Sequence, residues 1–132
     1  MIITTDPIAD MLTRIRNAAL IGSRTVVLPY SKAKRAVAEV LVQSGWVREL
    51  RVSEDNPRQL SLTLKYDERG RSVIHMLRSV SKPGRRVYVS RRDLPVVANN
   101  LGMAIVSTPQ GMMTNREARR RGLGGEVICE VY

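Results

Sequence analysis

Four arginines and three glycines crowd the segment MTNREARRRGLGGE, residues 113–126. A guanidinium group can hold two phosphate oxygens at once, and glycine lets a backbone approach a ligand or another chain closely. Arg116 and Arg120 would be neighbours on one face of a helix. The segment therefore predicts phosphate binding by these arginines, beside a bare backbone at Gly124 and Gly125. The alternative is a solvated basic face at a helix C-terminus, where the helix dipole favours cations.

A second polar segment, STPQG, lies just upstream at residues 107–111. Its hydroxyls, its amide and its glycine backbone can hydrogen-bond to base edges, 2′-hydroxyls and phosphates in a shallow groove. Proteins that bind single strands use aromatic stacking platforms instead, and this chain has no Phe, one Trp and four Tyr. The composition therefore favours a structured RNA, recognised by its shape, over an unpaired strand.

The net charge of +10 points to the same class of partner. Of the 22 basic residues, 18 are arginine, and a strongly positive surface attracts polyanions. GC-rich codon usage could also produce the arginine bias, but it does not explain the net charge. Nucleic acid is the predicted partner.

Other functions find little support in the sequence. Cys129 and His75 are the single residues of their types, so no metal-ligand set is apparent, and the glycine run matches neither the P-loop nor the dinucleotide fingerprint. We expect His75 to be a packed structural residue and the chain to be a cytosolic protein, not an enzyme, without cofactor, metal or small-molecule substrate. No apolar run is long enough to span a membrane. A helix-turn-helix is disfavoured because residues 23–30 form too long and too β-prone a connection.

The first half of the chain predicts an α-β-α-β-β order. A helix capped by Asp6 runs to Gly22, a strand covers 24–30, and a second helix runs from the cap Ser31 to Gly45. Residues 46–53 and 59–66 alternate as a hairpin that buries Leu60, Leu62 and Leu64. The first turn of the second helix carries three cations, Lys32, Lys34 and Arg35, whose charge is unfavourable at the positive end of the helix dipole. A bound phosphate would offset this repulsion, so the cluster is a candidate phosphate site; the alternative is that the three side chains are simply solvated.

The second half begins near Asp67, where the composition becomes basic: residues 69–92 hold eight Lys or Arg and no acid. Strands are predicted at residues 85–90, 101–107 and 125–132, the last of which closes the chain. Residues 72–81 fit either a strand or a short helix, and residues 93–100 include one helical turn. Thr114 and Glu117 form a capping box for a helix that ends at Gly122. The predicted class is α+β, with an α/β subdomain at 1–66 and a β-rich RNA-binding subdomain at 67–132.

Several motifs together resemble one family. In order and spacing, four segments are similar to the bacterial form of small-subunit ribosomal protein eight: TDPIADMLTRIRNA, KPGRRVYV, DLPVVANNLGMAIVSTPQG and MTNREARRRGLGGEVICEVY. The resemblance implies a two-part α+β protein that binds the central domain of 16S ribosomal RNA directly and helps to assemble the platform of the 30S subunit. It also implies neighbouring ribosomal proteins as partners, a cytoplasmic or organellar ribosome as location and, in some bacteria, repression of the protein's own operon mRNA.

The resemblance also implies a set of RNA-binding residues. The main surface carries over to Ser107, Thr108, Gly111, Gly124, Gly125 and Glu126, flanked by Tyr88, and the N-terminal motif contributes Arg14, Arg16 and Lys32 as backbone contacts. Pro109 stands where the family pattern has serine, which removes a hydroxyl and an N–H donor, and Gln110 replaces a common lysine. With Pro109, Arg116 and Arg120, these residues form the predicted RNA-binding set.

Overall fold

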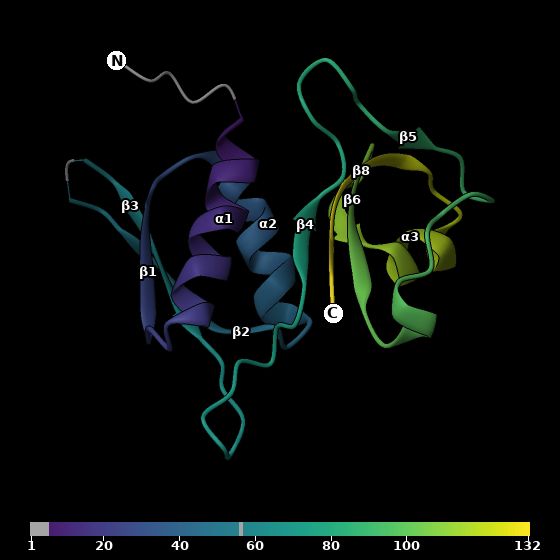
Figure 1. Cartoon of the computed structure of the whole chain (residues 1–132). Helices are drawn as coiled ribbons and strands as arrows, with labels where there is room; N and C mark the ends of the chain where they lie inside the picture. Colours follow the sequence, from purple (N-terminus) through teal and green to yellow (C-terminus); the bar gives the residue numbers. More distant parts are fainter. Residues whose placement is uncertain (1–5, 56) are drawn as a thin grey trace.

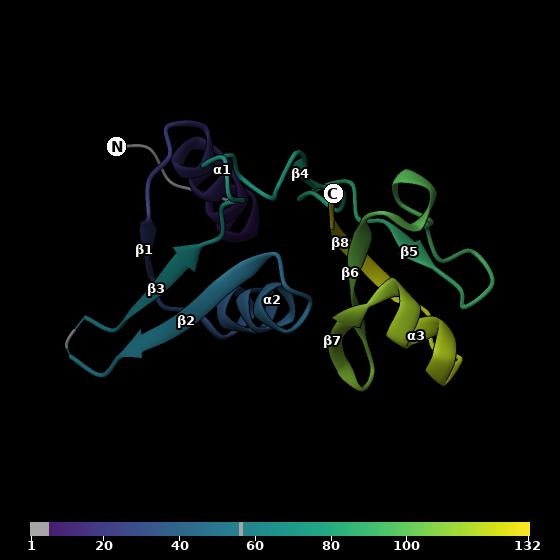
Figure 2. The ribbon, with the colours of Figure 1, turned by 90° about the horizontal axis from the view of Figure 1, so that it is seen from below.

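The computed structural model describes residues 6–55 and 57–132, which form an α+β fold as the sequence predicts. Two long helices, α1 (Pro7–Leu20) and α2 (Lys32–Gln43), lie between two antiparallel sheets, and a short helix, α3 (Asn115–Arg121), covers the far face of the second sheet (Figure 1 and Figure 2). Both halves of the chain therefore contribute to one layered structure.

The first sheet has the strand order β1-β3-β2 and comes entirely from the N-terminal half. Its strands are β1 (Thr25–Pro29), β2 (Val47–Ser53) and β3 (Gln59–Leu64). Leu60, Leu62 and Leu64 are buried against the helices, which confirms the alternation predicted for this hairpin. Apolar side chains at every second position place one face of the sheet on the core.

Each helix begins at the cap that the sequence predicts. The Asp6 carboxylate accepts from the backbone N of Ala9 at 3.0 Å, and the Ser31 hydroxyl accepts from that of Lys34 at 3.1 Å. The helical spacing of α2 predicts Ala33 on the inward face, but Ala33 is exposed and Lys34 is buried. The Lys34 ammonium donates to the Pro29 carbonyl at 2.9 Å, so its stem can pack inward while its charge stays hydrogen-bonded.

The second sheet has the order β4-β8-β6-β7, with β5 also paired to β8. Two predicted strands are shorter than expected: β4 covers only Leu77–Ser79 of residues 72–81, and β5 covers only Tyr88–Val89 of residues 85–90. The predicted helical turn is the 3-10 segment Ala98–Asn100. The strands β6 (Met103–Thr108) and β8 (Gly125–Val131) agree with prediction. The hairpin strand β7 (Gly111–Thr114) was not predicted, because Thr114 could be recognised only as a helix cap.

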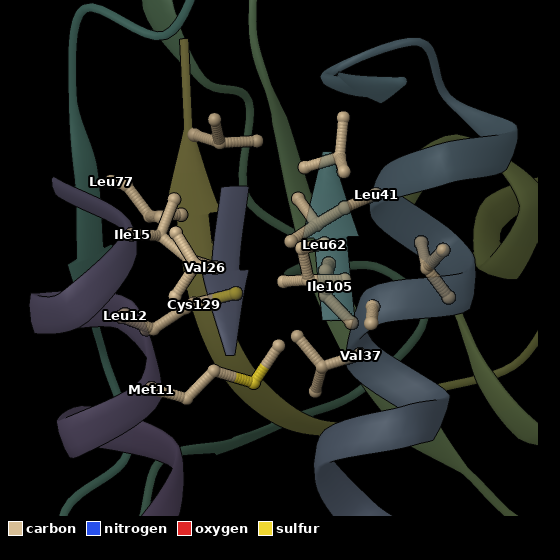
Figure 3. Close-up of a cluster of buried hydrophobic side chains, with 14 of the residues drawn as sticks. Met11, Leu12, Ile15, Val26, Val37, Leu41, Leu62, Leu77, Ile105 and Cys129 are labelled. Carbon is tan, nitrogen blue, oxygen red and sulfur yellow. The ribbon is translucent and has the colours of Figure 1, made fainter. Parts of the chain in front are cut away.

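The largest cluster of buried residues draws on both sheets. Figure 3 shows Met11, Leu12 and Ile15 of α1 facing Leu77 of β4 and Cys129 of β8, with Val37 and Leu41 of α2 beside Ile105 of β6. Burial raises the pKa of the Cys129 thiol to about 12, so this side chain behaves as a small apolar group. The packing fixes the second sheet against the helix layer.

His75 is exposed, so the expectation of a packed histidine was wrong. Its backbone N nevertheless donates to the Tyr132 carbonyl at 2.7 Å, so the main chain is held at this position although the residue is exposed. Among residues 6–55 and 57–132, no group of three His, Cys, Asp or Glu side chains is placed to hold a metal ion. No helix in the same ranges is long and apolar enough to cross a membrane.

Candidate nucleic-acid interface

One row of residues crosses the second sheet and brings together three of the predicted site residues. Tyr88 of β5 pairs with Glu126 of β8, Glu126 pairs with Ser107 of β6, and Ser107 pairs with Met112 of β7. Directly paired residues in neighbouring strands point to the same side of a sheet. The register therefore places the Tyr88 ring, the Glu126 carboxylate and the Ser107 hydroxyl side by side on one face.

The two glycines allow this row to form. A Cβ at Gly125 would overlap the Ser107 carbonyl oxygen and lie 2.9 Å from its carbon, and a Cβ at Gly124 would meet the backbone of Val89 and Ser90. Strand β8 thus fits closely between β5 and β6 only because both positions lack a side chain. The close approach expected of Gly124 and Gly125 is made to the protein's own strands.

The middle of the row carries an ion pair. Glu126 accepts from the Arg86 Nη1 atom at 3.5 Å, and its side chain is 19% exposed, whereas Tyr88 is 70% exposed. A half-buried carboxylate with one cation beside it keeps oxygen lone pairs free as acceptors. The row therefore combines an exposed ring, a positioned acceptor and a hydroxyl.

Thr108 plays a different part from Ser107. Its hydroxyl donates to the Gly111 carbonyl at 2.8 Å and accepts from the Gln110 backbone N at 3.1 Å, which closes the β6–β7 turn. Pro109 occupies the first loop position, where its fixed φ suits a turn. Gly111 has φ of 113°, which few other residues adopt. Within residues 6–55 and 57–132, the Ser107 hydroxyl makes no side-chain hydrogen bond and stays available to a ligand.

The arginines of α3 are held by internal partners. Glu117 pairs with Arg120 and with Arg121, the latter at 2.7 Å, and the Arg121 Nη1 atom donates to the Gln110 side chain at 3.1 Å. Arg116 donates to the Asn100 carbonyl. Hydrogen bonds from Arg120 and Arg121 lower the pKa of Glu117 from 4.5 to about 2. The α3 arginines are thus less available than their number suggests.

The capping box of α3 is only half formed. The Thr114 hydroxyl accepts from the Glu117 backbone N at 3.1 Å, as predicted, and Gly122 ends the helix with φ of 70°. The Glu117 carboxylate, however, turns toward the arginines instead of back to Thr114. Two charged donors bind a carboxylate more strongly than one backbone N–H, and Thr114 is already paired with Ile105 in the sheet.

Most of the N-terminal cations also have internal partners. Arg14 pairs with Asp10 at 3.1 Å, and Arg16 donates to the Leu77 carbonyl at 3.1 Å, which ties α1 to β4. Arg35 pairs with Glu39 at 2.9 Å. Lys32 is exposed and has no ion pair within the described ranges, so it is the freest cation of this predicted group.

Four exposed cations that flank Tyr88 in the chain were not in the predicted set. Lys82, Arg85, Arg91 and Arg92 are exposed and form no ion pair within residues 6–55 and 57–132. They flank Tyr88 in the chain, on the segments leading into and out of β5. The acid-free stretch 69–92 was the sequence signal that could have identified them.

Two buried polar residues hold these segments in place. The Ser81 hydroxyl accepts from the Val87 backbone N at 2.8 Å and thereby closes the loop that carries Lys82 and Arg85. The Asn115 side chain accepts from the Ala104 backbone N at 3.2 Å and donates to the Pro95 carbonyl at 2.8 Å. Asn115 thus fixes the segment that follows Arg91 and Arg92 onto β6.

Comparisons with known proteins agree with the resemblance found in the motifs. The family model described as ribosomal protein S8 matches residues 6–132. Proteins named small ribosomal subunit protein uS8 from Cupriavidus metallidurans and Paraburkholderia xenovorans are each 55% identical over 127 residues, which is 96% of both chains. The one from Leptothrix cholodnii is 52% identical over the same share. This chain belongs to the ribosomal protein S8 family.

Proposed function

We propose that this protein binds the central domain of 16S ribosomal RNA directly and early, and so helps to assemble the platform of the 30S subunit. Membership of the S8 family makes it a structural constituent of the small ribosomal subunit, associated with ribosomal RNA and other ribosomal proteins in the cytoplasmic ribosome, and not an enzyme. The proposal adds which part of the RNA is bound and when.

The observation that carries this proposal is the row formed by Tyr88, Glu126 and Ser107. A hydroxyl can donate to or accept from a base edge or a 2′-hydroxyl, and a carboxylate accepts from base amino groups or a 2′-hydroxyl. A phosphate would be repelled by Glu126, so the row suits contact with bases and sugars. The exposed Tyr88 ring can stack on a single accessible base.

The unpaired cations on either side of Tyr88 in the chain suit the phosphate backbone. Five cations can bind a phosphate without first giving up an internal partner: Lys32, Lys82, Arg85, Arg91 and Arg92. Four other arginines would first have to break a bond to a carboxylate or a carbonyl before they could bind the RNA: Arg14, Arg16, Arg116 and Arg120. We therefore assign the first group as the main phosphate contacts and the second as secondary contacts.

The β6–β7 turn and the glycines support this surface from behind. Thr108, Pro109 and Gly111 fix the turn next to Ser107, and Gly124 and Gly125 fix the spacing of the strands. Pro109 has neither an N–H nor a hydroxyl to offer, so its contribution to RNA binding is limited to shape. These five residues act mainly by positioning Ser107 and Glu126.

An mRNA that folds into the same shape would bind the same surface. We include the transcript of the protein's own operon among the proposed ligands, as the family resemblance implies. Competition between that leader RNA and the 16S fragment for the purified protein tests this point. Binding of both RNAs at once would contradict a shared site.

Chemical footprinting of small-subunit RNA with and without the purified protein tests the main proposal. We expect protection of one helix in the central domain, with 2′-hydroxyl and base positions protected as well as phosphates. The Ser107→Ala variant should weaken protection at a few neighbouring nucleotides. Protection confined to another domain, or none at protein concentrations that saturate binding, would show that the proposal is wrong.

A further inference from the structure

Two adjacent aliphatic side chains protrude where α1 ends. Leu20 is 87% exposed and Ile21 is 81% exposed, whereas Met11, Leu12 and Ile15 of α1 are buried in the core. Isolated exposed aliphatic residues are common on protein surfaces, but a contiguous pair beside a groove indicates an interaction site. Helix α1 ends on the side of the molecule where the loop of residues 66–72 also protrudes (Figure 1).

The pair borders a continuous groove. A cavity of about 1010 Å³ is lined on its apolar side by Leu20, Ile21 and Ile74, and Arg16 and Arg71 also line it. A second cavity of about 650 Å³ adjoins it, shares Gly22 and Gly70, and is lined by Arg24 and Arg48. The aliphatic side chains thus share one cavity with Arg16 and Arg71, and the adjoining cavity adds Arg24 and Arg48.

The charge around the groove is strongly one-sided. Glu49 is the single carboxylate among the lining residues, and it pairs with Arg51 at 3.1 Å. Arg24 and Arg48 form no ion pair within residues 6–55 and 57–132. Arg71 is partly neutralised, because it pairs with Asp67 at 3.3 Å, whereas Arg16 donates to a carbonyl and keeps its full charge. The groove therefore attracts a negatively charged occupant.

We propose that this groove docks an acidic segment of a neighbouring protein of the small subunit, with an aliphatic side chain of that segment packed on Leu20 and Ile21. A protein segment satisfies both features, because it can bring carboxylates to Arg24 and Arg48 and an apolar side chain to the centre. An RNA strand would satisfy the arginines but would leave the aliphatic pair against phosphate or water. The proposal rests on the chain's place in the small subunit.

The buried thiol of Cys129 makes a direct test simple. In the Ile21→Cys variant, the new thiol is the accessible one, and a benzophenone maleimide can be attached there. The labelled protein is then reconstituted into small subunits and irradiated. We expect an adduct with a ribosomal protein, at a peptide rich in Asp or Glu. An adduct with RNA, or no adduct in assembled subunits, would overturn the docking site.

Charge and apolar variants separate this inference from the proposed RNA function. Ile21→Asp should compete at least tenfold less well than wild type for incorporation into small subunits, whereas it should bind the isolated 16S fragment within twofold of wild type. Leu101→Asp makes the same change at an equally exposed aliphatic residue outside the groove and should incorporate normally. Equal incorporation of Ile21→Asp and wild type would contradict the docking site. Loss of the 16S footprint in the unaltered chain would contradict the proposed function instead.

Discussion

Helix α3 and the sheet row that contains Tyr88 show two ways in which this protein uses charge. In α3, four arginines lie close together, yet Arg120 and Arg121 are paired with Glu117, and Arg116 is bound to a backbone carbonyl. On the segments that flank Tyr88, the cations are spread along the chain, but Lys82, Arg85, Arg91 and Arg92 form no ion pair in the described ranges. The density of cations in a sequence therefore does not measure how many can bind a phosphate. Internal partners decide that.

Breaking the row itself should have the largest effect. In Gly125→Ala the new Cβ overlaps the Ser107 backbone, and neither strand can move without losing its pairing. We expect a loss of about 3 kcal/mol or more in the free energy of unfolding, together with weaker RNA binding. Urea denaturation measures the first effect. Gly70→Ala is the control, because Gly70 has φ of 78° and open space around it, so its cost comes from the backbone alone, about 1 kcal/mol.

The two hydroxyls next to each other in β6 allow a sharper comparison. Ser107→Ala should weaken binding to the 16S fragment by about 1–3 kcal/mol and leave unfolding almost unchanged, because that hydroxyl is free for RNA. Thr108→Ala should lower the free energy of unfolding by about 1 kcal/mol, because it breaks the bonds that close the turn. Titration calorimetry and urea denaturation together separate the two. The same pattern in both variants would contradict the distinction.

The cations provide the next comparison, through salt. For wild type, the logarithm of affinity should fall linearly with the logarithm of salt concentration. The double variant Arg91→Ala, Arg92→Ala should reduce that slope by about two, since each lost phosphate contact removes about one. Arg120→Ala should change it little, because its guanidinium is already paired with Glu117 and would have to exchange that partner for a phosphate. A larger change for Arg120 than for the pair would reverse our assignment.

The smallest expected effect concerns the stability of α3 in acid. The pKa of Glu117 is about 2 in the folded protein and 4.5 without its partners. A lowered pKa means that the carboxylate stabilises the fold above pH 4.5, and that this contribution is lost as the pH falls toward 2. Glu117→Gln should therefore flatten the dependence of unfolding on pH in that window. Parallel curves for the variant and wild type would show that the ion pairs do not affect stability.

Local features of the sequence predicted much of the fold. The caps Asp6, Ser31 and Thr114 and the stop Gly122 act on backbone groups within a few residues, so the three helices could be placed in advance. The lengths of strands β4 and β5 were overestimated from the sequence. Alternating residues make a strand possible, but the extent of pairing with β8 sets how long each strand is. The division of the chain at residue 67 stays a prediction; the largest core cluster includes residues from both sides of it.

The sequence predicted which residues belong to the candidate site, but it did not predict what each of them does. Ser107 was predicted from the hydroxyls of STPQG as well as from the family resemblance, whereas Tyr88 and Glu126 came from the resemblance alone. The structure brings all three into one row. Thr108, Gly124 and Gly125 belong to the same region but serve the turn and the strand spacing. Whether any of them contacts RNA stays a prediction that the variants above address.

The sequence by itself determined the local elements, the strong positive charge and membership of the family, because these depend on residue type and on neighbours a few positions away. The tertiary structure alone decided which cations are free and which side chains meet on one face of the sheet. The physical reason is that the partners of Arg16, Arg116 and Glu126 come from distant parts of the chain. Only strand register and helix packing bring those parts together.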